Sequence, residues 1–358
     1  MDTTEKLPIF SLTHDAYAKA VRERLGRGHD HAILLYKELF QSGYLEGRSP
    51  AFANAGRLLE EMVAITHWPL LPITKECSEG ETKKFLIKTY DGLEVESVLV
   101  PMQAGGTLCI SSQVGCRMGC TFCETGRMGL LRNLSVEEIV SQVFAARHRQ
   151  GMRIRNLVFM GMGEPFDNYE TVIEATRVLQ DPMGCAFGKR QITISTSGSI
   201  PGIERLMEEK DAPNLAVSLN APNNQIRNRL MPINRTHPME SLYETMRLYG
   251  EKTKREIFIA YVLIEEENDS LAHADELANY LEGLNVKINL IPYNAQSRDR
   301  FKKPADEAMS SFATRLRQHG YYTLFRQTKG PSIMAACGQL GNLQLRRQFL
   351  SKEKTQLT

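Results

Sequence analysis

Cys116-Arg117-Met118-Gly119-Cys120-Thr121-Phe122-Cys123 places three cysteines on one short loop, with three and then two residues between them. A structural zinc site usually takes four ligands in two separated pairs, so this loop is one thiol short of such a site. Three thiolates can instead hold three irons of a [4Fe–4S] cluster and leave the fourth iron open for a substrate. The spacing therefore favours an iron–sulfur site over the alternatives, which are a partial metal knuckle or three buried thiols.

The overall composition is that of a globular protein. The 358 residues suffice for one large domain and a smaller one, and no run of 18 apolar residues predicts a transmembrane helix. The first twelve residues lack the apolar core of a secretory signal, so we expect none. Seven clustered cysteines indicate metal or redox chemistry in a reducing, cytoplasmic compartment. A net charge of +2 neither requires nor excludes nucleic acid, because a local basic face is enough to bind it.

Residues 1–75 are predicted to form a helical accessory domain. Apolar residues recur at helical spacing over His14–Leu25 and His31–Gln41. Basic residues lie between and beside these apolar positions, and a basic face of this kind would contact RNA phosphates. A solvated helix face is the alternative, and the segment alone does not decide between them. The basic residues are Arg22, Arg24, Arg27, His29 and His31.

Residues 76–106 are predicted to be a β-hairpin connection. Asp91-Gly92 separates the apolar runs 84–90 and 93–100, a pattern typical of a type I′ turn with positive φ at both central residues. In the second strand Glu94 and Glu96 point to the same face, because side chains alternate along a strand. A carboxylate facing a cleft would serve as a base, and two solvated glutamates are the alternative.

Residues 107–345 alternate predicted strands with predicted helices. Such alternation implies parallel strands with right-handed crossovers. Six units are two short of a closed barrel, so we predict an α/β fold, an open partial (β/α)6 barrel, followed by a polar tail over 346–358. The predicted strands are 108–110, 156–160, 191–195, 215–218, 257–262 and 287–291, with a seventh at 322–326. The predicted helices start at Ser135 with a capping box to Glu138 and continue with 169–180, 201–210, 238–254, 271–284 and 306–320.

The unusual residues of the chain follow the carboxyl ends of these strands, where parallel barrels gather their sites. A glycine such as Gly163 lets the backbone approach a ligand, and the neighbouring Glu164 can accept from an ammonium group. Each loop taken singly is an ordinary strand-to-helix connection, so the convergence on one rim carries the argument. The residues concerned are Gly163, Glu164, Ser195, Ser218, Leu219, Asn220 and Asn294.

Two further thiols are candidates for the same rim. Cys109 lies in the first predicted strand, and Cys337 lies in a small-residue loop after the last one. If that loop folds over the rim, the two thiols meet near the cysteine loop; otherwise they are small buried hydrophobes, as we expect for Cys77 and Cys185.

Nine short motifs between Lys84 and Leu340 together resemble the RlmN/Cfr family of radical S-adenosylmethionine (radical SAM) RNA adenosine methyltransferases. The helical N-terminal segment resembles the accessory domain of that family only weakly. The motifs are Val95-Glu96-x-Val98, 109–113, the cysteine loop with Thr125-Gly126, Gly161–Glu164, Ser195-Thr196, Ser218-Leu219, Leu230–Asn234, Tyr293-Asn294 and 335–340.

The resemblance implies a set of cofactors and partners. Cys116, Cys120 and Cys123 would hold a [4Fe–4S] cluster, and the rim residues named above would bind SAM, of which two are used per turnover. A low-potential electron donor such as flavodoxin would supply the electron. The partner would be RNA, with 23S ribosomal RNA expected and tRNA as a further substrate, and the enzyme would act as a monomer away from membranes.

The resemblance also implies a role for each catalytic thiol. Cys337 would take a methyl group from one SAM, and a 5′-deoxyadenosyl radical from a second SAM would remove a hydrogen from it. The resulting methylene radical would add to adenine, most readily at C2, and Cys109 would release the product by forming a disulfide with Cys337. Either Glu96 or Cys109 would take the ring proton. The alternatives are methylation at C8, a radical SAM enzyme with a non-RNA substrate, and a metal-stabilised RNA-binding module without activity.

The sequence departs from the family pattern at several positions without losing a thiol. Glu124 stands where alanine is usual, Asn220 where histidine is usual, and Ala295 where proline is usual. Ser332-Ile333-Met334 replaces an Asp-Ile-Asp stretch. Asn220 can still bind a ribose hydroxyl but cannot take a proton. These departures leave the choice between C2 and C8 open.

Overall fold

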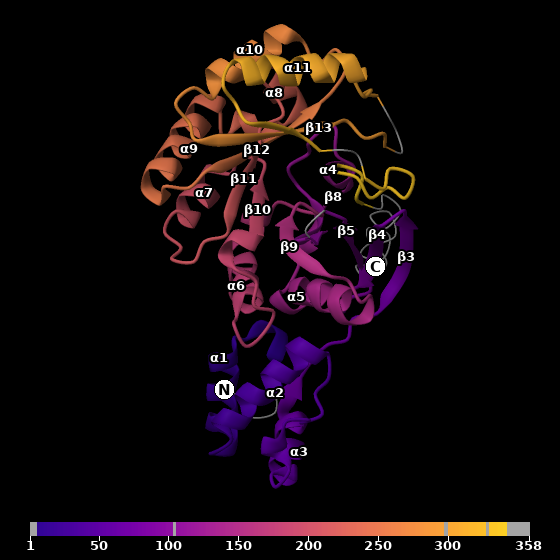
Figure 1. Ribbon diagram of the computed structural model, residues 1–358, viewed down its shortest axis with the longest axis vertical. Coiled ribbons are helices and arrows are strands. Elements are labelled where there is room, and N and C mark those ends of the chain that lie inside the picture. Colours follow the sequence, from indigo (N-terminus) through magenta and orange to yellow (C-terminus); the bar gives the residue numbers. More distant parts are fainter. Residues whose placement is uncertain (1–5, 103–104, 297–299, 327–328, 342–358) are drawn as a thin grey trace, which may run out of the picture.

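The computed structural model describes residues 6–102, 105–296, 300–326 and 329–341. A lobe of three helices lies at one end of the molecule, below a large curved sheet (Figure 1). These helices are α1 (His14–Leu25), α2 (His29–Ser42) and α3 (Gly56–Ile65). The sequence predicted the first two, whereas α3 was not predicted separately. A short parallel pair, β1 (Leu7–Pro8) with β2 (Thr66–His67), closes the lobe.

One sheet of ten strands organises the rest of the chain. Seven strands run parallel to one another in the order of the sequence, and three more extend the sheet antiparallel beyond β6. The parallel strands are β6 (Gly106–Cys109), β9 (Ile154–Phe159), β10 (Ile192–Thr196), β11 (Asn214–Ser218), β12 (Ile257–Leu263), β13 (Val286–Pro292) and β14 (Thr323–Phe325). The antiparallel strands are β3 (Ile73–Glu79), β4 (Thr82–Lys88) and β5 (Glu94–Val100).

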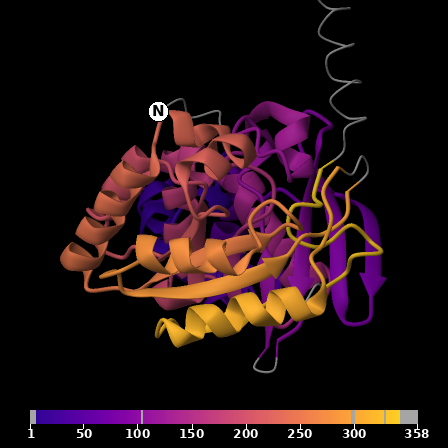
Figure 2. The same cartoon turned by 90° about the horizontal axis from the view of Figure 1, so that it is seen from above.

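Helices cover the outer side of the curved sheet (Figure 2). The arrangement confirms the predicted open partial (β/α)6 barrel, including its seventh strand. The covering helices are α5 (Val136–Phe144), α6 (Tyr169–Gln180), α7 (Ile200–Leu206), α9 (Met239–Thr253), α10 (Leu271–Tyr280) and α11 (Asp306–Gln318). The helix α5 begins with the predicted capping box, in which Ser135 accepts from the Glu138 amide.

Two helices and a hairpin occur within the loops that carry the site. They are α4 (Glu124–Met128), α8 (Asn224–Leu230) and the pair β7 (Gln113–Cys116) with β8 (Gly129–Asn133). A Cβ atom on Gly115, whose φ is +82°, would lie 1.8 Å from the carbonyl oxygen of Gly129. Only glycine fits where β7 and β8 approach this closely. The close contact fixes the direction in which the chain enters the cysteine loop at Cys116.

Residues 73–75, which fall within the predicted helical segment, are extended in the structure. These residues begin β3, because the neighbouring β4 offers them a full antiparallel ladder from Ile73 to Glu79. The hairpin is therefore a three-stranded extension of the main sheet. The polar tail predicted for 346–358, and the last residues of the predicted barrel range, lie outside the described residues.

The turn at Asp91-Gly92 is present but differs from the predicted type I′ turn. Gly92 alone has positive φ, at +84°, while Asp91 does not. The Gly92 amide donates to Thr89 and the Thr89 amide to Leu93, as in a type I turn followed by a bulge. The Asp91 carboxylate accepts from the Thr89 hydroxyl and pairs with Arg132, contacts that suit the right-handed conformation.

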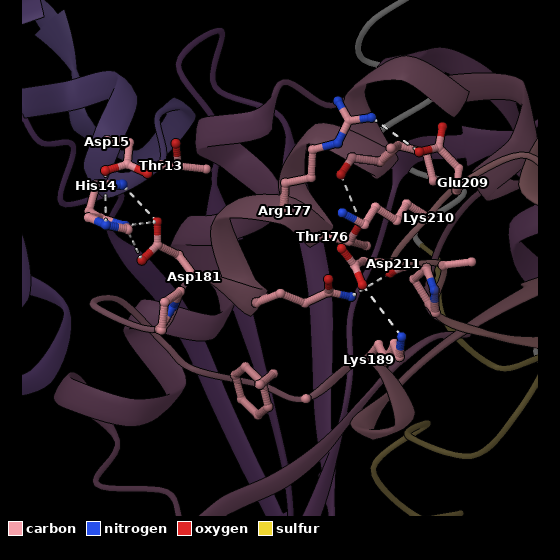
Figure 3. Close-up of a pocket in the computed structure, with 17 residues that line it drawn as sticks. Thr13, His14, Asp15, Thr176, Arg177, Asp181, Lys189, Glu209, Lys210 and Asp211 are labelled. Atoms are coloured by element: carbon pink, nitrogen blue, oxygen red, sulfur yellow. Dashed lines mark hydrogen bonds and ion pairs between the residues drawn. The ribbon is translucent and has the colours of Figure 1, made fainter. Parts of the chain in front are cut away.

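A continuous apolar core runs from the N-terminal lobe into the barrel. The Phe10 ring lies 5.4 Å from that of Phe40 and 4.9 Å from that of Phe144, so the lobe packs directly on α5. Beside this junction is a polar cavity away from the cysteine loop (Figure 3). In it the buried carboxylate of Asp181 accepts from the His14 backbone amide at 2.7 Å and contacts the His14 ring at 2.9 Å. This polar contact fastens α1 to the barrel.

Among the residues that the structure describes, no helix has both the length and the apolarity needed to cross a membrane.

Candidate active site

A cavity at the carboxyl ends of the parallel strands contains most of the predicted site residues. The three cysteines of the loop, Cys337 and the ends of five strands surround it. The predicted residues that line it are Cys116, Cys120, Cys123, Gly163, Glu164, Ser195, Ser218, Asn220 and Cys337. Leu219 and Asn294 do not line the cavity. The Leu219 side chain is in the core, and the side-chain nitrogen of Asn294 donates to the Cys337 carbonyl at 3.1 Å.

All three cysteines of the loop line this cavity. Burial raises the pKa of the Cys116 thiol to about 12, and it raises the pKa values of Cys120 and Cys123 as well, with neighbouring charged groups adding to each rise. In the described residues, no three Cys, His, Asp or Glu side chains gather closely enough for one shared ion. A four-iron cluster does not require such a gathering, because each thiolate binds a different iron. The donor set therefore fits the cluster, which would replace the three thiol protons.

Glu164 lines the same cavity and is almost fully buried. Its Oε2 accepts from the Ser197 amide at 2.7 Å and from the Ser197 hydroxyl at 2.8 Å. Burial raises the pKa of this carboxyl, while the donors at Ser197 oppose the rise. Gly163 beside it has a φ of +103°, and a Cβ there would lie 2.6 Å from Gln113. The glycine thus allows β7 and the β9 loop to pack close together, which orients Glu164.

The segment that carries Cys337 folds over the cavity and is tied to the cysteine loop. The Glu124 amide, next after Cys123, donates to the Gly338 carbonyl at 2.8 Å. The Thr125 hydroxyl donates to the Leu340 carbonyl, and the Gln339 amide group donates to the Ala295 carbonyl at 2.6 Å. Cys337 itself remains exposed within this frame, so its thiol is held over the cavity and stays accessible.

Cys109 ends β6 at the edge of the same region. Burial raises the pKa of the Cys109 thiol to about 12, and the Cys337 thiol contributes to the rise, whereas the Met160 amide and Arg326 oppose it. The structure therefore brings Cys109 and Cys337 within electrostatic range of each other, both as free thiols. Cys185 is buried as expected, while Cys77 is partly exposed on β3.

Comparison with known proteins places this geometry in a family. Residues 110–278 match the model of the radical SAM superfamily. The chain is 57% identical over 343 residues to a protein of Protochlamydia amoebophila named probable dual-specificity RNA methyltransferase RlmN 1, covering 96% of each chain. The chain belongs to the RlmN/Cfr family of radical SAM RNA methyltransferases.

Two further comparisons agree with that assignment. A Halorhodospira halophila protein named dual-specificity RNA methyltransferase RlmN is 46% identical over 274 residues, or 76% of each chain. The crystal structure of a radical SAM methyltransferase from Sphaerobacter thermophilus matches with a TM-score of 0.86 and 38% identity, covering 94% of this chain and 98% of that one. Membership of the RlmN/Cfr family implies SAM and a [4Fe–4S] cluster as cofactors, which the cavity's donor set fits.

The residues that depart from the RlmN/Cfr pattern are held by specific contacts. The Glu124 side chain is buried, and its carboxylate lies 3.6 Å from the Arg127 guanidinium. Asn220 has a φ of +56°, a conformation that asparagine tolerates. Its Oδ1 accepts from the Val262 amide at 2.9 Å, and its Nδ2 lies 3.3 Å from the Met231 sulfur. Both side chains therefore have structural partners inside the RlmN/Cfr fold.

Glu96 is placed differently from either sequence-based expectation. It is neither solvated nor part of the cavity lining described above: it is buried and forms an ion pair of 3.1 Å with Lys84. Its Oε1 accepts from the Gly341 amide at 3.2 Å, and Lys84 donates to the Met334 carbonyl at 3.0 Å. The pair thus braces the Cys337 segment on both sides of the thiol, at Met334 and at Gly341.

One residue of the site was missed by sequence reasoning altogether. Arg227, on α8, is completely buried and does not line the cavity itself, but it donates to the carbonyl oxygen of Ser197, which does, and to that of Leu219. Arginine is ordinarily found at protein surfaces, so no periodicity in the sequence marks this one as buried. The nearest signal was the motif Leu230–Asn234, which supplies its third partner, Asn234.

Proposed function

We propose that this protein methylates adenosine in RNA, at C2, with 23S ribosomal RNA as the main substrate and tRNA as a further one. The observation that carries the proposal is that Cys337 lines the same cavity as Cys116, Cys120 and Cys123, with Cys109 in electrostatic range. A radical enzyme that only abstracts hydrogen needs no such methyl-carrying thiol. The names of the RlmN relatives support RNA as the substrate, and their dual specificity suits two kinds of RNA.

In this proposal the rim residues hold SAM. Three thiolates bind the cluster, which when bound supplies the electron that cleaves the sulfonium bond of SAM. Glu164, Ser195 and Ser218 lie where they would accept from or donate to the polar groups of SAM, and Gly163 lets the backbone come close. The buried Glu164 carboxylate suits the SAM ammonium group, because a charge-assisted hydrogen bond is strongest where water is excluded.

The two remaining thiols perform the transfer. The Cys337 sulfur would first attack the methyl carbon of one SAM, so that a new S–CH3 bond forms, the sulfonium S–CH3 bond breaks and S-adenosylhomocysteine leaves. The 5′-deoxyadenosyl radical from the second SAM would then remove a hydrogen atom from this methyl group, and the methylene radical would add to the adenine ring. The adduct would lose one electron, which the oxidised cluster could take back, and its ring proton, which the Cys109 sulfur would take. The Cys109 sulfur would then attack the Cys337 sulfur, so that the S–S bond forms and the S–CH2 bond breaks. The electron pair of that bond stays with the carbon, which takes the proton released from Cys109 and becomes the methyl group.

The structural position of Glu96 bears on which group removes the ring proton. Its carboxylate forms an ion pair with Lys84 and accepts a hydrogen bond from the Gly341 amide. We therefore favour Cys109 over Glu96 as the base and assign Glu96 to holding the Cys337 segment. Burial raises the pKa of the Cys109 thiol, and the nearby Arg326 opposes this rise and so favours the thiolate that a base requires.

The accessory lobe is proposed to contact the same RNA. Arg22 and Arg27 are exposed on α1 and the loop after it, although Arg27 also pairs with Glu61 at 2.8 Å. Replacing both with glutamate should weaken RNA binding and reduce its salt dependence without changing SAM cleavage. Unchanged RNA affinity in that variant would assign these charges to a solvated surface.

The deciding experiment is nucleoside mass spectrometry with chromatographic standards. The reconstituted protein is incubated anaerobically with SAM, a reductant and unmodified 23S ribosomal RNA or tRNA. 2-Methyladenosine is expected, and its loss in Cys337→Ala would assign the methyl carrier. 8-Methyladenosine would overturn the C2 assignment, and release of 5′-deoxyadenosine without methylated RNA would overturn the substrate.

A further inference from the structure

Arg227 has an unusual electrostatic position. Its side chain is completely buried, and its three hydrogen bonds go to neutral oxygens: Ser197 O at 2.6 Å, Asn234 Oδ1 at 2.9 Å and Leu219 O at 3.2 Å. No carboxylate forms an ion pair with it in the part of the chain that the structure describes. Buried charges in proteins are normally paired, because desolvating an ion costs several kcal/mol.

The polar partners of Arg227 are themselves fixed. The Asn234 amide nitrogen donates to the side-chain oxygens of Asn224 at 2.9 Å and Asn228 at 2.8 Å, so its oxygen must face the guanidinium. The Ser197 and Leu219 carbonyls lie just past the carboxyl ends of β10 and β11. Arg227 therefore cannot swing toward solvent without breaking the two loops that hold Glu164 and Asn220.

The electrostatic surroundings point to what balances this charge. The helix that carries Arg227 is joined to the cysteine loop, because the Thr121 amide donates to the Leu230 carbonyl at 2.9 Å. Cys120 also packs against the buried cluster that contains Leu230. Burial lowers the pKa of Arg227 to about 10, and Tyr280 and then Cys120 act against this effect. Burial raises the pKa of Tyr280 above its usual range, so its hydroxyl supplies no negative charge. The group beside α8 that would become negative is thus the cysteine loop with its cluster.

We propose that Arg227 is the buried counter-charge of the iron–sulfur cluster and makes the cluster easier to reduce. The inference rests on the proposed function, in which Cys116, Cys120 and Cys123 hold that cluster. Adding one electron makes the cluster with its three thiolates more negative, and a fixed cation nearby stabilises the added charge most effectively where water is excluded. In this role Arg227 stabilises the negative charge of the reduced cluster and does not contact the substrate.

The test measures the reduction of the cluster and does not use methylation. Full-length protein is loaded with iron and sulfide anaerobically, titrated with dithionite and redox mediators without SAM, and followed by the electron paramagnetic resonance signal of the reduced cluster. In Arg227→Met, the ratio of reduced to oxidised cluster at a fixed potential should fall about tenfold or more. In Arg227→Lys, which keeps the charge, most of this ratio should be retained.

Two more variants separate charge from structure. Asn234→Asp leaves Arg227 in place but sets a carboxylate against it, and the amide of Asn228 can turn to donate to the new oxygen. This variant should lower the ratio as Arg227→Met does, and it keeps the test available if Arg227→Met does not fold. Arg255 is the matched control, because it also donates to two backbone carbonyls, Ala212 and Pro213, and to the Asn214 side chain, at the opposite end of β11. Arg255→Met should leave the ratio unchanged.

The outcomes distinguish this inference from the proposed function. A wild-type protein that takes up no cluster would overturn both. Wild-type and variant proteins with equal iron content and equal reduction curves would overturn the role of Arg227 and leave the proposed function intact. A lowered ratio in Arg227→Met and Asn234→Asp, retained in Arg227→Lys and Arg255→Met, is the expected result.

Discussion

The amide nitrogen of Glu124 lies 2.8 Å from the carbonyl oxygen of Gly338, and this hydrogen bond joins the loop of the three cysteines to the segment that carries Cys337. Because both groups belong to the backbone, the contact does not depend on the side chain at position 124. This explains how a glutamate can replace the usual alanine there without displacing Cys337. The Glu124 carboxylate turns toward Arg127 instead.

The ion pair between Lys84 and Glu96 should be required for a stable Cys337 segment. Lys84→Met leaves the buried Glu96 carboxylate without its cation and removes the bond to the Met334 carbonyl. We expect a loss of about 3 kcal/mol in the free energy of unfolding, measured by chemical denaturation, and slower methylation. Lys83, the exposed neighbour on the same strand, is the control, and Lys83→Met should change stability by less than about 0.5 kcal/mol. Equal stabilities for the two variants would contradict the bracing role.

The contact between His14 and Asp181 should fasten the N-terminal lobe to the barrel. In His14→Ala the almost fully buried Asp181 carboxylate loses its contact with the imidazole ring and keeps the backbone donors of residue 14 and Met183. The free energy of unfolding should fall by about 2 kcal/mol, and hydrogen exchange in α1 should accelerate. His29→Ala, which alters an exposed pair with Asp30, should do neither. If α1 exchanged at the wild-type rate in His14→Ala, the lobe would be held by its apolar core alone.

Tyr17 should make the protein lose stability at alkaline pH. Burial raises the pKa of Tyr17 from 10 to about 12, and its hydroxyl lies 2.7 Å from that of Thr66. A raised folded-state pKa gives stability that is complete below pH 10 and is lost as the pH rises toward 12. Tyr17→Phe should therefore be less stable than wild type by about 1 kcal/mol at about pH 8, and this deficit should shrink above about pH 10. Thermal unfolding across that alkaline range gives the measurement; a deficit that stays constant throughout would refute the linkage.

Glu164 should set the affinity for SAM. Glu164→Gln keeps the size of the side chain but removes the charge that is proposed to face the SAM ammonium group. Calorimetry on the cluster-loaded protein should give a Kd for SAM at least about tenfold higher than that of wild type. Glu170→Gln, a few residues further along and exposed, should bind SAM as wild type does. Unchanged affinity in Glu164→Gln would mean that the carboxylate serves only to hold the Ser197 loop.

Much of the fold could be predicted because it is encoded in local patterns. Strand and helix periodicities alternate from residue 107 onward, and parallel topology then places the strand ends at one rim, so the sequence alone was enough to group Gly163, Glu164, Ser195 and Ser218. The capping box at Ser135 was predicted for the same reason, since both partners lie within four residues. The partial error at Asp91-Gly92 has the opposite cause, because the distant Arg132 contributes to the turn and no local pattern indicates this contact.

The remaining features depend on contacts between residues far apart in the sequence. β3 is an edge strand whose charged sequence becomes extended only because β4 lies beside it. Glu96 contacts the Gly341 amide because the segment that carries Cys337 folds back onto β5, where Glu96 also pairs with Lys84. The alternation of side chains along β5 does not reveal these contacts. Arg227 is the clearest case, because its burial follows from the closure of α8 over two strand ends.

The anchoring of Cys337 also has a consequence for the order of events during synthesis. Cys337 follows Cys123 by more than two hundred residues, so at ribosomal speed about 10 to 40 s separate the appearance of the two. For that interval the nascent chain has the three thiols proposed to hold the cluster but not the segment that covers them, since Gly338 and Leu340 have not yet reached Glu124 and Thr125. A chain that stops before Cys337 therefore contains the strands of the sheet but lacks the thiol proposed to carry the methyl group. On this proposal, synthesis of the Cys337 segment is the step that completes the site.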